Sequence, residues 1–319
     1  ELAQRVRDAI KKLNFHPNHL ARSLMATRTK TLAFLTPDIS NAAFLRIFKA
    51  VDAIACRRGY SLFLLNTDGS MEMARRALTQ VMELKMDGVF FTLNWAMTQL
   101  ETELGQLAER GVRMMGVAGS YAVPNVDCFL WDEEGAGEQL GRYLRRLGHR
   151  EVLCVGPSRS RSAEKRWGGA RRAYDDSPES VTLADTNGYT AQSGYDAMHN
   201  AIIAARPFTV VLAFNDAIAT GALAALHDQG LSVPEDVSFV SFGDHHRDFS
   251  RPQITSMTFD EEKIAELAGN RLIDRIEGRL TEPADHFYLP LRLSTQPSSR
   301  KLTARDKAVR PSPGRKKPK

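Results

Sequence analysis

Several polar side chains stand where an apolar, strand-like run gives way to a helical pattern, a common location for ligand-binding residues. Asn215 and Asp216 directly follow the run 210–214, and Asp244 follows the run 237–242 after one glycine. Asp216 can equally cap or favour a helix N-terminus, which leaves Asn215 as the better ligand contact. Arg166 begins near another helical segment, and its planar guanidinium suits two-pronged contacts with hydroxyls or a carboxylate. Alternatively, Arg166 has no ligand role and is simply solvated among neighbouring arginines and lysines.

Aromatic side chains could form the flat apolar walls of a ligand-binding pocket. Phe44, Trp95 and Trp131 are the candidates, since an aromatic face packs well on the C–H surface of a sugar, although any one of them alone is more often a core residue. His245 and His246 could suggest a metal, but no spaced carboxylates or cysteines accompany them, so we predict a surface loop and no metal or cofactor.

Catalytic signatures are missing from the sequence. No strand is followed by GxGxxG, and GxxxxGK[ST], GxSxG and HExxH do not occur. These residues therefore indicate binding rather than catalysis, and we expect no enzyme.

From residue 31 the chain alternates strand and helix. Near-continuous apolar strands separated by helices predict an α/β protein with parallel sheets covered on both faces. The expected strands are 31–36, 60–65, 88–92, 113–118, 151–156, 210–214, 237–242 and a final strand 286–293. The expected helices are 41–58, 70–85, 97–110, 133–147, 163–175, 191–205, 216–229 and 260–278.

The spacing of these elements divides best into two Rossmann-like lobes. We expect a core over 31–297, with a first lobe of about 31–130 plus 258–282 and a second lobe of about 131–257 plus 283–297. Two lobes joined by several crossings make a hinged clamp whose cleft lies at the strand carboxyl ends.

Charge is concentrated at the two ends of the chain. The first 30 residues carry a net charge of +5 and the last 22 carry +8, so residues 31–297 sum to −8 within a total of +5. The electrostatic footprint for DNA is therefore confined to the termini. Residues 298–319, rich in Ser, Pro, Lys and Arg, are expected to be a disordered basic tail.

The basic N-terminal segment has a pattern suited to DNA. Residues 1–13 read as an amphipathic helix, and Pro17 stops it before Asn18, a good N-cap, begins a second one. That second helix is about eight residues long, too short to be stable alone. It combines basic residues with Leu20 and Leu24, which predicts an apolar wedge inserted into a duplex.

The composition of the chain indicates its cellular compartment and its class of protein. The chain has 319 residues, 43% of them hydrophobic, enough to bury one large core or two ordinary ones. No apolar run approaches a membrane span, so we expect no membrane partner. Cys56, Cys128 and Cys154 form no CxxC pair and suit buried, reduced thiols in the cytoplasm. The chain starts with Glu rather than Met and has no export leader, so we expect a missing upstream piece.

Short motifs follow one another in a characteristic order along residues 1–297. The N-terminal ones are Pro17-Asn18, Ala21-Arg22-Ser23-Leu24 and Pro37-Asp38-Ile39-Ser40-Asn41 followed by Phe44. The later ones are Gly148-His149, Arg166-Trp167-Gly168-Gly169, Asn215-Asp216, Gly230-Leu231-Ser232-Val233-Pro234-Glu235-Asp236 and Pro252-Gln253-Ile254-Thr255-Ser256. In this order they resemble the lac and galactose repressor family.

The resemblance implies a homodimeric transcriptional regulator, a repressor by class, with a periplasmic-binding-protein-like core. Residues 1–15 would be the remnant of a helix-turn-helix head whose recognition helix is absent, and residues 16–30 the hinge helix and linker. By position, Leu24 resembles the intercalating leucine, with Asn18, Ala21 and Arg22 near phosphates or groove edges. Lacking the recognition helix, the chain as given is expected to bind operator DNA poorly.

The core cleft would hold a small-molecule effector, a sugar or a sugar acid, that changes operator affinity. The resemblance points Arg166 into this cleft and adds Asp244, which stands one residue later than the usual ligand acid. Phe44, Trp131, Asn215 and Asp216 complete the expected site. Residues 117–119 lack the acid that sugar-binding relatives often carry, which fits an effector that is acidic or small.

The alternative to a regulator is an exported sugar-binding protein of a transporter, which shares the two-lobed core. Such a protein would have no use for the basic segment 17–30. We also expect the core to dimerise through the outer surfaces of helices 41–58 and 70–85, whose apolar residues exceed what one sheet face needs.

Overall fold

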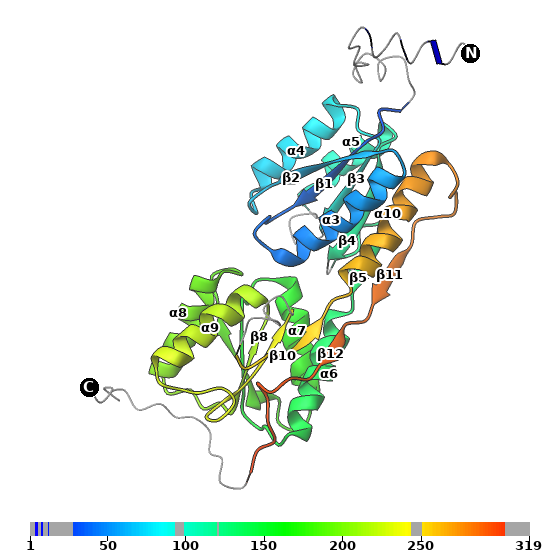
Figure 1. Ribbon diagram of the computed structural model, residues 1–319. Helices are drawn as coiled ribbons and strands as arrows, with labels where there is room; N and C mark the ends of the chain where they lie inside the picture. The colour runs from blue at the N-terminus through cyan, green and yellow to red at the C-terminus, as the bar shows by residue number, and fades with distance from the viewer. Residues whose placement is uncertain are drawn as a thin grey trace.

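The structure is a computed structural model that describes residues 28–92, 99–119, 121–243 and 251–303, together with Gln4, Arg5, Asp8 and Lys12. The predicted Asn18, Ala21, Arg22 and Leu24 lie outside the described residues, as do Trp95, Asp244, His245 and His246. Within the described ranges the chain forms two six-stranded sheets in two lobes (Figure 1). This confirms the predicted α/β fold with two parallel-dominated sheets.

The first sheet has the strand order β11-β5-β4-β3-β1-β2, and all five of its strand pairings are parallel. Its strands are β1 (Thr31–Thr36), β2 (Ser61–Asn66), β3 (Gly88–Thr92), β4 (Arg113–Gly119), β5 (Asp127–Trp131) and β11 (His286–Leu289). β3 and β5 are buried along their whole length, which explains their continuous apolar sequence.

Two helices cover each face of the first sheet. α3 (Ala42–Arg57) and α10 (Glu261–Glu277) pack together on one face. α4 (Met71–Glu83) and α5 (Glu101–Glu109) form a separate core on the other. Helix starts carry polar caps where the sequence supplies them: the side chain of Asn41 accepts from the Ala43 amide, and that of Asp260 accepts from the Lys263 amide.

The second sheet has the order β12-β10-β9-β8-β6-β7, parallel except for the antiparallel pair β10–β12. Its strands are β6 (Val152–Gly156), β7 (Val181–Asp185), β8 (Val210–Ala213), β9 (Ser238–Phe242), β10 (Thr255–Thr258) and β12 (Arg292–Ser294). Its helices are α6 (Glu133–Arg146) with α7 (Arg161–Arg172), α8 (Ala191–Ile203) with α9 (Asp216–Asp228), and the short 3₁₀ turn η2 (Pro178–Ser180).

The chain passes between the lobes three times. It crosses from β5 to α6, from β10 to α10, and from β11 to β12 (Figure 1). The late helix α10 packs on α3 of the first lobe, and three crossings join the two lobes. None of the helices in the described ranges is long and apolar enough to cross a membrane.

Three sequence-based expectations are corrected here. The strand predicted over 286–293 is two strands, β11 and β12, and β11 joins the first sheet rather than the second lobe. The prediction of a disordered tail is wrong at its first residue, because Ser298 is buried and its hydroxyl donates to the Phe239 carbonyl at 2.6 Å. Cys56 is exposed on α3, whereas Cys128 and Cys154 are buried free thiols as expected.

Candidate functional site

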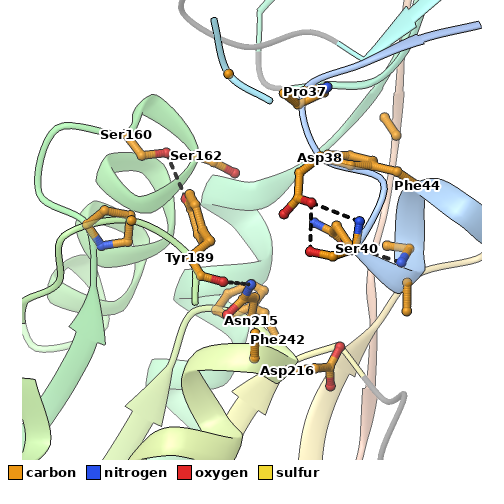
Figure 2. A pocket seen from close by; sticks show the side chains of 18 of the residues that line it. Pro37, Asp38, Ser40, Phe44, Ser160, Ser162, Tyr189, Asn215, Asp216 and Phe242 are labelled. Carbon is orange, nitrogen blue, oxygen red and sulfur yellow. Dashed lines mark hydrogen bonds between the residues drawn. The ribbon is translucent and has the colours of Figure 1, made fainter. Parts of the chain in front are cut away.

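A cavity of about 1320 Å³ lies between the two lobes at the carboxyl ends of both sheets. Pro37, Ala118 and Trp131 enter it from the ends of strands in the first sheet. Pro157, Asp185, Asn215 and Phe242 enter it from strand ends in the second. Because parallel strands end at one edge of each sheet, the fold itself gathers these residues around one cavity. Figure 2 shows Pro37 from the first lobe and Asn215 and Phe242 from the second.

Arg166 lies inside this cavity, as the sequence analysis expected, but it is already paired. Its side chain is buried, with 7% of the residue exposed. One terminal nitrogen, Nη2, lies 2.5 Å from Oε1 of Glu133, which is 3% exposed. The other, Nη1, donates to the Phe214 carbonyl, and the guanidinium lies 4.6 Å from the centre of the Phe242 ring. A positive group thus sits in the cleft with a carboxylate bound to it.

The close contact of α6 and α7 brings Arg166 and Glu133 together. Glycines permit this contact: a Cβ on Gly137 would clash with the Arg166 carbonyl, and one on Gly169 would clash with the Glu134 carbonyl. Glu133 is the first residue of α6, where the Asp132 side chain caps the helix by accepting from the Gly135 amide at 3.0 Å. The Ser162 hydroxyl also donates to Glu133.

Aromatic side chains from both lobes line the cavity, and the predicted Phe44 and Trp131 are among them. Trp131 stacks at a tilt against Phe259, with ring centroids 5.3 Å apart. Tyr121 lies under the guanidinium of Arg161, 5.5 Å from its ring centre, so a cation–π contact joins the lobes across the cavity.

Asn215 and Asp216 both line the cavity at the start of α9. The side chain of Asn215, not that of Asp216, caps α9: its Oδ1 accepts from the Ile218 amide at 2.8 Å. Its Nδ2 donates to the Tyr189 carbonyl at 3.3 Å (Figure 2). Asp216 begins the helix, where its negative charge is favourable, and its carboxylate lies against Gly243.

Tyr189 and its partner Ser160 are cavity residues that the sequence analysis missed. The hydroxyl groups of Ser160 and Tyr189 lie 2.7 Å apart, and desolvation raises the pKa of the tyrosine phenol (Figure 2). Asp38, a member of the Pro37–Asn41 motif, also lines the cavity and accepts from the Ser40 amide at 2.8 Å.

Two missed carboxylates, Glu133 and Asp185, stand next to strands that the sequence analysis did not recognise. Glu133 follows β5 and Asp185 ends β7, where it accepts from the Ser158 amide at 2.6 Å. With both strands recognised, the rule that ligands bind beyond strand carboxyl ends would have pointed to both residues.

Metal binding finds no support in the part of the chain that the structure covers. No group of three or more His, Cys, Asp and Glu side chains there could hold a metal ion. Burial raises the pKa of the Cys128 thiol to about 11, which keeps it protonated and unreactive at neutral pH.

Known proteins share both the sequence and the fold. A family model described as a periplasmic binding protein-like domain matches residues 142–299. The HTH-type transcriptional repressor PurR of Escherichia coli O1:K1 is 30% identical over 283 residues, covering 86% of this chain and 82% of the relative.

Solved structures agree with that match. A complex of the transcriptional regulator CelR with cellobiose superimposes with a TM-score of 0.74 at 26% identity, covering 93% of this chain and 90% of the other. A LacI family transcriptional regulator from Enterococcus faecium with bound ribose superimposes with a TM-score of 0.77 at 22% identity, covering 86% of this chain and 100% of the other. Because the relatives are transcriptional regulators, they support this interpretation over a sugar-binding protein of a transporter and over an enzyme. The chain therefore belongs to the lac and galactose repressor family of transcriptional regulators.

Proposed function

We propose that this protein is a DNA-binding repressor whose operator affinity is set by a sugar or sugar acid held between its lobes. The observation that carries this proposal is the cavity itself: it lies at both sets of strand ends and combines aromatic walls with the buried Arg166. Sugars bind well to such surfaces, because an aromatic face packs on C–H groups while polar groups satisfy hydroxyls. The cellobiose complex of the 26% identical relative supports the same class of ligand.

The coupling to DNA would come from lobe movement. Three chain crossings form a hinge, and ligand contacts to both lobes would favour one relative position of the lobes over the other. The segment 16–30 enters the first lobe directly before β1, so a shift of that lobe would be passed to it.

Operator contacts and assembly complete the proposal. We assign the DNA contacts to Asn18, Ala21, Arg22 and Leu24, on the family pattern, and the working form to a homodimer in the cytoplasm. In a dimer the two short helices would support each other across the duplex, which offsets their weak individual stability.

A thermal-shift screen of sugars, sugar acids and phosphosugars tests the effector site. A ligand at about 100 times its dissociation constant adds about 2.7 kcal/mol to the free energy of unfolding. A hit should then change the affinity of the protein for operator fragments selected from genomic DNA. Stabilisation by no member of these classes would contradict the proposal.

A further inference from the structure

We propose that Glu133 is a specificity-determining residue, which restricts the effector to uncharged, polyhydroxylated compounds and excludes sugar acids and phosphosugars. This inference rests on the proposed function, because it names the class of ligand that the same cavity accepts. It follows from where the charges of the cavity lie and which of them are already matched.

The guanidinium of Arg166 is the one buried cation among the described residues that line the cavity. Its two terminal nitrogens are directed at Glu133 and at the Phe214 carbonyl, and Phe242 lies against its face. The Nε of Arg166 is buried and has no hydrogen-bond partner within the described part of the chain, so it stays open to a single ligand oxygen. A carboxylate or phosphate that accepts from Nε and Nη2 together would have to displace Glu133 from Nη2. The displaced side chain is 3% exposed, so it would remain in the cleft as an unhydrated like charge.

The rest of the lining repeats this bias. Arg159 and Arg161 are exposed, so solvent weakens their attraction for an anion, and Arg161 already lies over Tyr121. Against the three guanidinium groups stand six carboxylates, contributed by both lobes: Asp38, Asp68, Glu133, Asp185, Asp216 and Glu261.

The missing acid at 117–119 is therefore no sign of an acidic effector. Ala118 lines the cavity there, but carboxylates from other elements hold the local charge negative. A neutral sugar avoids the conflict, because hydroxyls donate to carboxylates and accept from a guanidinium without disturbing the ion pair.

The test compares the whole protein with three variants, using D-glucose, D-glucuronate and inorganic phosphate as probes in calorimetric titrations. We expect the wild type to prefer glucose to glucuronate and to show no saturable phosphate binding. Glu133→Gln keeps the size of the side chain and releases the charge of Arg166, so it should bind glucuronate at least about tenfold more tightly than the wild type and should gain saturable phosphate binding. The double variant Glu133→Gln/Arg166→Gln should lose that gain.

Glu134→Gln is the matched control, because it makes the same change on the next residue of α6, where Glu134 pairs with Arg172 outside the cavity lining. It should leave anion binding unchanged. A wild type that prefers glucuronate, or a Glu133→Gln protein with no gain, would overturn the inference. Should Glu133→Gln fail to fold, the wild-type preference between glucose and glucuronate decides. If no sugar binds the wild type, the proposed function of this cavity is wrong. The phosphate titrations of the wild type and the variants then still decide the role of Glu133.

Discussion

Arg166 and Glu133 are stable in the protein interior only as a pair. Each has lost most of its water, and desolvation of one ion is repaid by the other together with the Ser162 hydroxyl and the Phe214 carbonyl. Such a pair adds little net stability compared with apolar residues, so its retention in the cleft is better explained by ligand recognition than by folding.

Arg166→Ala is expected to abolish the response to the effector. It should also lower the free energy of unfolding by about 3–5 kcal/mol, because Glu133 stays buried without its cation. Ligand titration and urea unfolding measure the two effects.

Arg172→Ala serves as the control for that variant, since it deletes an arginine of the same helix whose ion pair with Glu134 is exposed. Its stability and ligand affinity should stay close to those of the wild type. An unchanged titration curve for Arg166→Ala would remove Arg166 from the site.

At the scale of elements, α10 connects the cavity to the entry of the N-terminal segment. Glu261 at its start lines the cavity and is bonded to Arg46 at 2.7 Å. Glu277 at its end accepts from Lys30 at 3.0 Å, and Lys30 also lies over the Tyr60 ring. Movement of this helix would therefore reach Lys30, which directly follows the segment proposed to bind DNA.

Asp87 holds that same entry point through the backbone. Its carboxylate accepts from the Thr29 amide at 3.0 Å and from the Lys30 amide at 2.8 Å. Asp87→Ala should speed hydrogen exchange of these two amides by at least about tenfold, the equivalent of one lost hydrogen bond of about 1.4 kcal/mol. Glu83→Ala, at the exposed end of α4, is the control, and equal exchange in the two variants would count against the anchor.

Asp127 joins three elements of the first lobe. It is buried at the start of β5 and pairs with Arg271 and Arg275 of α10, while accepting from the Asp285 amide ahead of β11. Burial alone would raise the pKa of this carboxyl. The hydrogen bonds from Arg275, from Asp285 and from Arg271 outweigh burial and hold the pKa below its ordinary value of 3.8.

A lowered pKa makes the contribution of Asp127 dependent on pH. The stabilisation is fully present above pH 3.8 and is lost as the pH falls through the native pKa. Asp127→Asn should therefore cost about 1.5–3 kcal/mol at neutral pH, as expected for a hydrogen bond to a charged partner. The gap between variant and wild type should close in urea unfolding below pH 3.8, and a gap that widened on acidification would refute the assignment.

At the scale of the whole molecule, the first sheet ends in two open edge strands, β2 and β11. Each carries an exposed aromatic residue: Phe63 is 46% exposed and Tyr288 is 59% exposed. The apolar face of α3, expected to serve dimerisation, instead packs against α10. The surplus of exposed apolar groups near the expected dimer face thus includes Ile39, Phe63, Met73 and Leu84.

Phe63→Glu should weaken self-association, because it places a charge among these apolar groups. Loss of one central aromatic contact is worth about 2 kcal/mol, or roughly 30-fold in the dimer dissociation constant. Tyr288→Glu makes the same kind of change on the opposite edge of the sheet and should leave the dimer intact. Sedimentation equilibrium distinguishes the two, and a wild type that is monomeric at micromolar concentration would exclude the homodimer.

Local patterns predicted most of the elements. The strand 31–36 and the strand 88–92 lie where their apolar runs place them, and the helices that follow begin within a few residues of their predicted starts. Short-range physics decides these features: apolar periodicity, capping side chains and helix-ending glycines all act within a few residues.

Other strands were missed because they form through pairing with residues far away in the sequence. β5 ends in the aromatic Trp131 and borders polar residues, and it becomes a strand by pairing with β4 and β11. The break between β11 and β12 has the same origin, since the two halves of one apolar run pair with partners in different lobes.

The binding site divides along the same line. The sequence predicted a polar cavity with aromatic walls from the residue types of Arg166, Phe44, Trp131 and Asn215. The pairing of Arg166 with Glu133 across α6 and α7, 33 residues apart, was decided only by the close helix contact that their glycines allow. Periodicity encodes neighbours along one element, whereas the net charge offered to a ligand depends on side chains that meet only after the chain has folded.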